Sequence, residues 1–337
     1  MSRGLGDVYK RQLLFLVATG CREDELVVPT EYDIIPESPS DTTRIRGMYL
    51  VNEGNMGSNK CSLDYLDYFT GLYARNFYAE RNPNVVKELG DVGNDIAIYG
   101  SKLWAVINCS NKVEVMRAGD AVRLGQIDIP NCRSIIFHKG YAYVTSYAGP
   151  VEINPDYRQK GFVAKIDTAT LREVGRCTVG YQPDGLAVCG DKIYVANSGG
   201  YMVPNYENTL SVVDIATFTE VKRVPVAINL NQVLSDSHGN VWVSSRGDYY
   251  GVSSKLYCYD PKADAVTDSI DTPVSAMTLH GDSLYIISTA WSNVSMSDEA
   301  STAIVNTATR RQVSAGFVAP DVMALVKKPY LSLIHIS

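Results

Sequence analysis

The sequence predicts an all-β fold, a β-propeller built from four-stranded antiparallel blades, and three observations support this prediction. A β-hairpin pattern is repeated along the chain, most clearly at residues 184–199, where an apolar stretch, a glycine turn and an alternating stretch follow one another. No segment sustains the apolar spacing of an amphipathic helix. The turn glycines recur roughly every forty to fifty residues, the period of propeller blades. These glycines are Gly100, Gly140, Gly190, Gly239 and Gly281.

A third and a fourth strand are expected after each hairpin. In the clearest copy they cover residues 209–214 and 220–226, each of a length typical for strands. Matching pairs cover 162–167 with 173–179, and 255–260 with 265–270. The third strand ends on an aspartate in all three copies, and such a carboxylate accepts hydrogen bonds from the N–H groups of the following turn. These aspartates are therefore expected to serve the fold.

The copies predict a seven-bladed ring that is truncated here to about six blades plus one strand. The first blade holds residues 48–54 and 62–67, and 321–327 would begin a seventh blade. The propeller is thus expected to cover residues 46–330. Blades two to six are expected to start near Asn94, Arg133, Gly185, Gln232 and Ser275.

The N-terminal region resembles a bacterial lipoprotein signal. Residues 13–20 form an apolar run, too short to span a bilayer, and Cys21 follows as the residue that would be acylated. Acidic residues directly behind this cysteine resemble the surface-export signal of Bacteroidota outer-membrane lipoproteins, and 21–45 is expected to be a flexible tether. The protein would then be a surface-exposed lipoprotein of the outer membrane. The alternative is that Cys21 is a buried thiol at the end of a strand.

Both ends of the sequence resemble translated sequencing-adapter read-through. Residues 1–12 and 331–337 are therefore expected to be artefacts outside the fold, like fusion scars. If this interpretation holds, the natural ends of the gene lie elsewhere.

Composition excludes one class of partner and constrains the cysteines. The chain has 337 residues, a formal charge of −6 and no basic stripe, so no nucleic-acid partner is expected. Six cysteines follow Cys21 without the spacing of a disulfide framework. Most of them are expected to be buried thiols.

The histidines argue against catalysis and against a metal site. His138, His238 and His280 share one repeat position, the turn between the first and second strands, and His335 lies in the excluded tail. That turn opens on the face opposite the long loops. The face with the long loops therefore lacks a histidine, the usual general base. No Cys or His cluster has metal-ligand spacing. We assign no catalytic residue and no metal ligand, and we expect a protein that is not an enzyme.

The loops after the second strands are the expected binding surface. Two are long, residues 147–161 and 198–208, and the chain contains 22 Tyr against 7 Phe. A rim of Tyr, Asn and Arg on a rigid scaffold suits a large ligand with apolar and polar parts. The asparagines have a second interpretation, closing turns, and the tyrosines have one as well, packing between blades. The candidates are Asn52, Asn55, Asn108, Tyr147, Asn197, Tyr201, Tyr206, Arg246, Tyr249, Tyr250 and Trp291.

The hairpins at 143–146 and 194–197, which read Tyr-Val-Thr-Ser and Tyr-Val-Ala-Asn, resemble the YVTN β-propeller-repeat family. Residues 52–58 and 94–100 and the lipoprotein start are in addition similar to Bacteroidota surface propeller lipoproteins. This resemblance covers about residues 46–328. Some members of that group capture cobalamin for a TonB-dependent transporter. The resemblance implies cobalamin or another corrinoid as ligand, no covalently bound cofactor, and an outer-membrane transporter as partner. No ligand-contacting motif matches residue by residue.

Two other functions stay open at this point. Fold analogy allows a propeller enzyme, such as a lyase or a quinone-dependent dehydrogenase. The third function is a protein-interaction platform on the cell surface.

Overall fold

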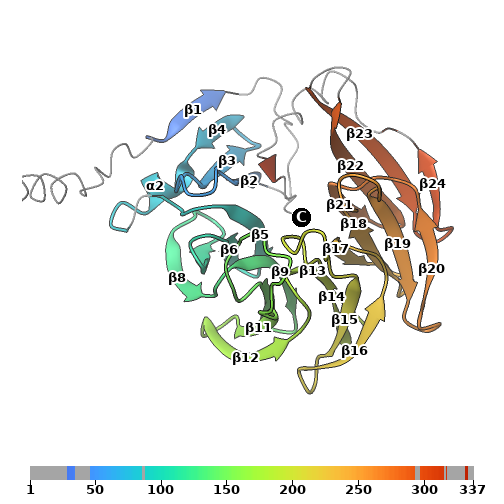
Figure 1. The fold of residues 1–337 in the computed structure, drawn as a ribbon. Coiled ribbons are helices and arrows are strands. Elements are labelled where there is room, and N and C mark those ends of the chain that lie inside the picture. The colour runs from blue at the N-terminus through green and yellow to red at the C-terminus, as the bar shows by residue number, and fades with distance from the viewer. Residues whose placement is uncertain are drawn as a thin grey trace, which may run out of the picture.

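The computed structural model describes residues 29–34, 46–85, 88–292, 297–314, 316 and 331–332 of the 337-residue chain. The strands of this part form six antiparallel sheets arranged around a common centre (Figure 1). The predicted all-β propeller with four-stranded blades is confirmed. The expected start of a seventh blade at 321–327, the apolar run at 13–20 and Cys21 lie outside the described residues.

Five blades consist of four strands that follow one another in the chain, with each strand paired to the next. The second blade holds β5 (Gly93–Tyr99), β6 (Lys102–Ile107), β7 (Lys112–Arg117) and β8 (Arg123–Asp128). The third holds β9 (Cys132–His138), β10 (Tyr141–Ser146), β11 (Phe162–Asp167) and β12 (Arg172–Thr178). The fourth holds β13 (Pro183–Cys189), β14 (Lys192–Asn197), β15 (Thr209–Asp214) and β16 (Thr219–Pro225). The fifth blade holds β17 (Leu230–Ser235), β18 (Val241–Ser245), β19 (Lys255–Asp260) and β20 (Ala265–Ile270). The sixth holds β21 (Ala276–His280), β22 (Ser283–Ser292), β23 (Ser297–Asn306) and β24 (Arg311–Ser314).

The first blade is assembled differently, because its strands come from separate parts of the chain. Strands β2 (Gly47–Asn52), β3 (Ser62–Asp67) and β4 (Leu72–Arg75) follow one another, and α2 (Phe77–Arg81) comes after them. Strand β1 (Glu31–Ile34) pairs with β4, and β25 (Leu331–Ser332) pairs with β2. Thus part of the segment expected to be a tether, and part of the C-terminal tail expected to be an artefact, form strands.

Apolar residues fill each junction between consecutive blades. One buried cluster joins each of the five pairs of neighbouring blades in the described structure. Strand β6 shows why: Leu103 and Ala105 face the first blade, whereas Trp104 and Val106 face the third, and all four are fully buried. A strand covered on both faces reads as a continuous apolar run. Full burial of a Leu or Val side chain, such as Leu103 or Val106, stabilises the fold by about 1.5–3 kcal/mol.

The aspartates at the ends of the third strands close the following turns, as predicted. The Asp167 Oδ1 accepts hydrogen bonds from the N–H groups of Ala169 and Thr170, at 2.9 and 2.8 Å. Asp214 and Asp260 accept equivalent bonds in the fourth and fifth blades. The repeated aspartate therefore belongs to the architecture.

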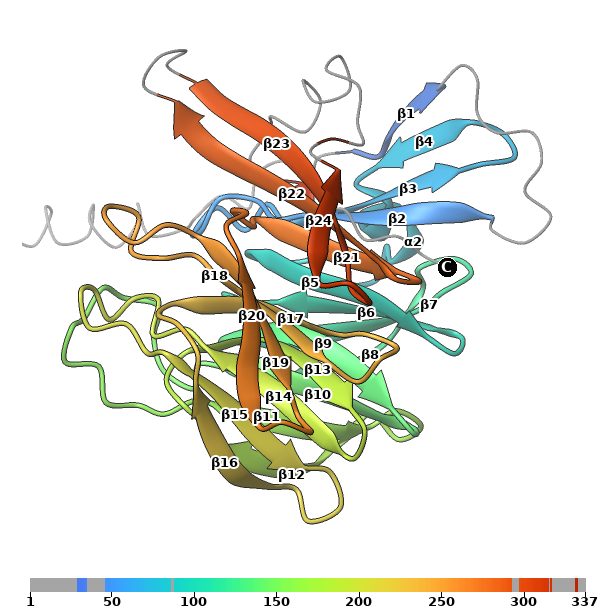
Figure 2. The same ribbon diagram turned by 90° about the vertical axis from the view of Figure 1, so that its right-hand side faces the viewer.

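The two long loops after the second strands, 147–161 and 198–208, are present as predicted, but the sixth blade differs. In the sixth blade the second strand is longer, because β22 continues to Ser292 and pairs with β23 in a projecting hairpin (Figure 2). The physical reason lies in the sequence: the segment 288–292 contains no glycine or proline to end the strand, unlike the loops with Gly149, Gly199 and Gly247.

The cysteines after Cys21 are free thiols, as expected. Four of the six are buried, and Cys109 and Cys189 are half-buried. Among the helices that the structure describes, none has both the length and the apolar character needed to cross a bilayer.

Candidate functional site at the channel mouth

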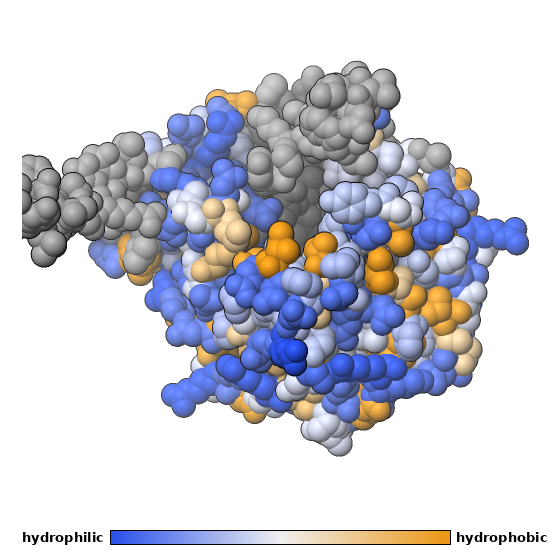
Figure 3. Space-filling view, in the orientation of Figure 1, coloured by the Kyte–Doolittle hydropathy of each residue, from blue (hydrophilic) through white to orange (hydrophobic). Residues whose placement is uncertain are grey.

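The loops that follow the second strands emerge on the face turned toward the viewer in Figure 1, and they project to the left in Figure 2. Figure 3 shows this face to be largely hydrophilic, with apolar residues gathered near its middle. The first strands of the blades lie nearest the centre, so their first residues and the long loops meet here. We call this place the channel mouth.

A buried carboxylate joins side chains from three blades at the channel mouth. Asp184, the second residue of β13, is 3% exposed. Its Oδ1 accepts a hydrogen bond from Arg133 Nε at 2.9 Å, and its Oδ2 accepts one from Arg246 Nη1 at 2.8 Å. The Tyr147 hydroxyl donates to Oδ1 at 3.1 Å. Asp184, Arg133, Arg246 and Tyr147 form the mouth cluster.

The strand ladder explains why Arg133 and Asp184 meet. Cys132 and Pro183 occupy equivalent positions, since each pairs with the last residue of the second strand in its blade. The next residue along each first strand is therefore Arg133 in the third blade and Asp184 in the fourth. The equivalent residue of the second blade is Asn94, whose amide lies beside the Arg133 guanidinium. One repeat position thus supplies polar side chains from three neighbouring blades beside the channel.

The mouth cluster carries one more positive than negative charge. Burial alone would raise the pKa of Asp184, but Arg133 and Arg246 outweigh it and hold the pKa below its usual range. Half-buried Glu53 lies close enough to be influenced by Arg133, and burial raises the pKa of Glu53. The carboxylate of Asp184 therefore stays ionised between two guanidinium groups.

Arg246 has donors to spare. Its guanidinium offers five N–H groups, and only Nη1 has a hydrogen bond among the described residues. The side chain is 29% exposed, compared with 14% for Arg133. Arg246 is therefore held in place by Asp184 while its remaining donors are open to a ligand.

Two tyrosines form an aromatic wall beside the arginines. The Arg133 guanidinium lies over the Tyr147 ring, 4.9 Å from its centroid. Tyr201 packs edge-on against Tyr147 with centroids 6.3 Å apart. Tyr147 is buried and Tyr201 is half-buried, so Tyr201 offers the more accessible ring.

Two buried amides near the Tyr201 turn are incompletely paired. Gln182 and Asn229 are fully buried and precede the first strands of the fourth and fifth blades. Gln182 Oε1 accepts from the Tyr201 N–H at 2.7 Å, and Asn229 Nδ2 donates to the Gly247 carbonyl at 2.9 Å. Within the described chain, Gln182 Nε2 and Asn229 Oδ1 have no partner. Such buried polar atoms are costly unless a ligand or ordered water satisfies them.

The structure brings three of the predicted site residues together and uses three of the predicted asparagines to hold the fold. Tyr147, Tyr201 and Arg246 meet at the mouth cluster. Asn52, Asn108 and Asn197 bond to fold atoms instead, namely Ser62 Oγ at 3.0 Å, the Cys132 carbonyl at 3.0 Å and Ser211 Oγ at 2.8 Å.

The other candidates lie farther out. Asn55 is exposed in the loop between β2 and β3. Tyr249 and Tyr250 are 68% and 93% exposed, and they are near enough to Tyr206 to influence its hydroxyl. Trp291 lies in β22 opposite Asp298, and its side chain is outside the described part.

The three described histidines stay away from the channel mouth. They lie at the turns between first and second strands, as predicted, and His238 Nε2 is 2.9 Å from Asp282 Oδ1 there. In the described residues no group of three or more His, Cys, Asp or Glu side chains is arranged to hold a metal ion.

Asp95 in the channel wall is expected to make stability depend on pH. It accepts the N–H groups of Ile96 and Ile135, yet burial raises its pKa to about 7. Because an unfolded aspartate has a pKa near 4, the folded chain binds more protons between about pH 4 and 7. The contribution of Asp95 to stability therefore falls as pH rises through this window.

We compare the stability of Asp95→Asn with that of the unsubstituted chain at two pH values. We expect this difference to favour the variant more at pH 8 than at pH 5. Urea midpoints of both proteins at the two pH values measure this. An equal difference at both values would contradict the assignment.

Comparison with known proteins places this fold in a family. A family model described as "Domain of unknown function (DUF5074)" matches residues 46–319. The chain belongs to this family. No curated protein matches the DUF5074 chain.

Solved structures share the propeller fold of the DUF5074 chain at low identity. Hydrazine synthase of Kuenenia stuttgartiensis matches with 15% identity and a TM-score of 0.53, over 63% of this chain and 62% of that one. The Pan2 WD40 domain of Neurospora crassa matches with 10% identity and a TM-score of 0.50, over 66% of this chain and 65% of that one. The DUF5074 chain thus spans less than two thirds of either chain, and the likeness concerns the fold alone.

Proposed function

We propose that this protein binds a small molecule at the channel mouth and does not transform it. The observation that carries the proposal is Arg246, which is anchored on buried Asp184, is 29% exposed, and has further guanidinium N–H donors without a partner among the described residues. A planar guanidinium held in this way is suited to carboxylate and phosphate groups. The unpaired amide atoms of Gln182 and Asn229 nearby favour a ligand with polar groups of its own.

A corrinoid such as cobalamin fits this chemistry and is the ligand that we propose. It presents a phosphate, many side-chain amides and broad apolar surfaces. The phosphate would accept from Arg246, and Tyr201 would cover an apolar face. The amides would meet Asn94 and Asn231, the residue of the fifth blade at the same repeat position. A binding role is favoured over catalysis because the described histidines lie on the opposite face.

We further propose the cellular setting that the N-terminal sequence favours. Cys21 would carry the lipid, and the protein would stand on the outer surface of the outer membrane. There it would pass its ligand to a TonB-dependent transporter. The support is the apolar run before Cys21 and the acidic residues after it.

Cyanocobalamin tests the ligand directly, because its visible absorbance reports binding. We expect the purified protein to retain the colour through gel filtration, and Arg246→Gln to weaken binding at least tenfold in equilibrium dialysis. This loss corresponds to about 1.4 kcal/mol or more, within the range for a hydrogen bond to a charged group.

Arg310→Gln is the matched control, because Arg310 pairs with Asp268 in a contact between the fifth and sixth blades. This control should bind like the unsubstituted chain. A colourless protein peak would contradict the proposal of a corrinoid ligand. Equal binding by both variants would show that Arg246 does not contact the ligand.

A further inference from the structure

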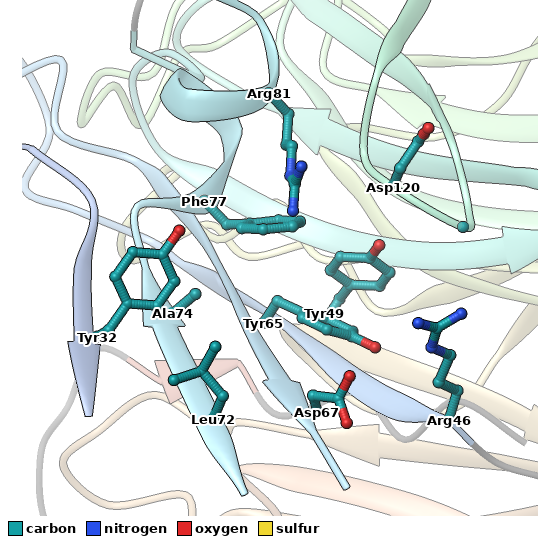
Figure 4. Close-up of a pocket in the computed structure, with 11 residues that line it drawn as sticks. Tyr32, Arg46, Tyr49, Tyr65, Asp67, Leu72, Ala74, Phe77, Arg81 and Asp120 are labelled. Atoms are coloured by element: carbon teal, nitrogen blue, oxygen red, sulfur yellow. The ribbon is translucent and has the colours of Figure 1, made fainter. Parts of the chain in front are cut away.

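A cavity lies on the face opposite the channel mouth, between the first two blades. It has a volume of about 210 Å³ and is lined by residues from β2, β3, β4, α2 and the β7–β8 turn, with Tyr32 of β1 at one side (Figure 4). This is the volume of about seven water molecules, which suits one ring with its substituents.

Three aromatic rings in contact with one another form one wall of this cavity. The Tyr65 ring lies 4.8 Å from that of Tyr49 and 5.4 Å from that of Phe77, between centroids. Gly47 permits the arrangement, because a Cβ there would fall 2.6 Å from the Tyr65 hydroxyl oxygen. Tyr32 and Leu72 add apolar surface that is 49% and 36% exposed. The apolar part of a ligand therefore has surface to contact.

The available charge in the cavity is positive. Arg46 forms no ion pair with the residues that the structure describes. Arg81 stacks on Phe77 with its guanidinium carbon 4.5 Å from the ring centroid, and its nearest carboxylate oxygen, on Glu80, is 4.0 Å away. Both guanidinium groups lie along the same cavity in Figure 4.

The two acidic residues of the cavity already have partners. Asp120 pairs with Arg117 at 3.0 Å. The Asp67 Oδ1 accepts from the N–H groups of Phe69 and Thr70, at 2.8 and 3.1 Å. Asp67 keeps a second oxygen, and the Tyr65 hydroxyl has no hydrogen-bond partner among the described residues. These two groups lie together below the rings in Figure 4 and suit ligand hydroxyls.

We propose that this cavity binds a sugar ring that carries a carboxylate, such as a uronic acid. The carboxylate would accept from Arg46 and Arg81, since arginine matches the geometry of that group. The C–H face of the ring would pack on Tyr32 and Leu72, and ring hydroxyls would bond to Tyr65 and Asp67. The site lies across the propeller from the mouth cluster and is independent of it.

Titration calorimetry with D-glucuronate, D-glucose and inorganic sulfate tests the proposal on the full chain. We expect heat from glucuronate alone, Arg46→Gln to weaken its binding at least tenfold, and Tyr65→Phe to weaken it several-fold. Arg75→Gln is the matched control, an exposed arginine of the same blade that pairs with Asp33 outside this cavity, and it should bind normally.

Absence of glucuronate binding would overturn the proposal, as would equal binding of glucose or an unchanged affinity in Arg46→Gln. Sulfate binding as tight as glucuronate would reduce the cavity to a general anion site and would also overturn it. Unchanged cyanocobalamin binding by Arg46→Gln keeps this test separate from that of the channel mouth.

Discussion

Replacing Asp184 with alanine is expected to destabilise the folded chain by about 3–5 kcal/mol. The carboxylate is 3% exposed and sits between Arg133 and Arg246, so its removal leaves two guanidinium groups at the channel mouth without their anion. Tyr147 loses the acceptor of its hydroxyl as well. The unfolding free energy from urea titrations of both proteins measures the effect.

Asp191→Ala is the control for this prediction. Asp191 also pairs with a cation, Lys192, at 2.8 Å, but its side chain is 83% exposed. Exposed pairs contribute about 0–1 kcal/mol, so this variant should stay close to the unsubstituted chain. Similar losses in the two variants would show that burial of the Asp184 pair has no special role.

Acid should reduce the difference between the unsubstituted chain and Asp184→Ala. The two arginines hold the pKa of folded Asp184 below that of an unfolded aspartate, about 4. The contribution is therefore fully present above the unfolded pKa and is lost as pH falls through the folded pKa. Urea midpoints at pH 7 and in the acid range provide the comparison, and an undiminished difference in acid would contradict the assignment.

The blades were predictable from sequence because burial on both faces leaves a clear pattern. Expected and observed bounds agree at 162–167, 209–214, 255–260 and 265–270. Turn chemistry supports the same prediction, because glycines and aspartates have local reasons for their positions. The first blade was harder to predict, because the pairing of β1 with β4 leaves no repeated pattern in the sequence.

The mouth cluster was predicted in part. Arg246, Tyr147 and the adjacent Tyr201 lie in the loops after the second strands, which are the expected binding surface. Arg133 and Asp184 were missed because they lie inside the repeat, where residues were assigned to the architecture. A signal was present: the equivalent position holds Asn94, Arg133, Asp184 and Asn231, and such polar variety is unusual beside an apolar core. The pairing across blades could not be predicted without the register.

Gly185→Ala is the second substitution with a large expected effect. A Cβ on Gly185 would lie 2.5 Å from the Asn231 carbonyl oxygen and 2.8 Å from the Gln232 Cα. Both are backbone atoms of β17, so neither can move aside as a flexible side chain would. We expect a loss of about 3 kcal/mol. For a domain of this size this corresponds to a fall in melting temperature of about 4–5 °C.

Gly119→Ala is the control for that clash, because its Cβ would meet no atom of the described structure within 4 Å. It should melt near the unsubstituted chain. The equivalent positions of the second and third blades hold Asp95 and Ser134, so the fourth and fifth blades approach unusually closely at Gly185. Since Asp184 is its neighbour, Gly185→Ala should also shift the anchor of Arg246 and weaken ligand binding. If binding survives unchanged in a destabilised variant, the close approach serves stability alone.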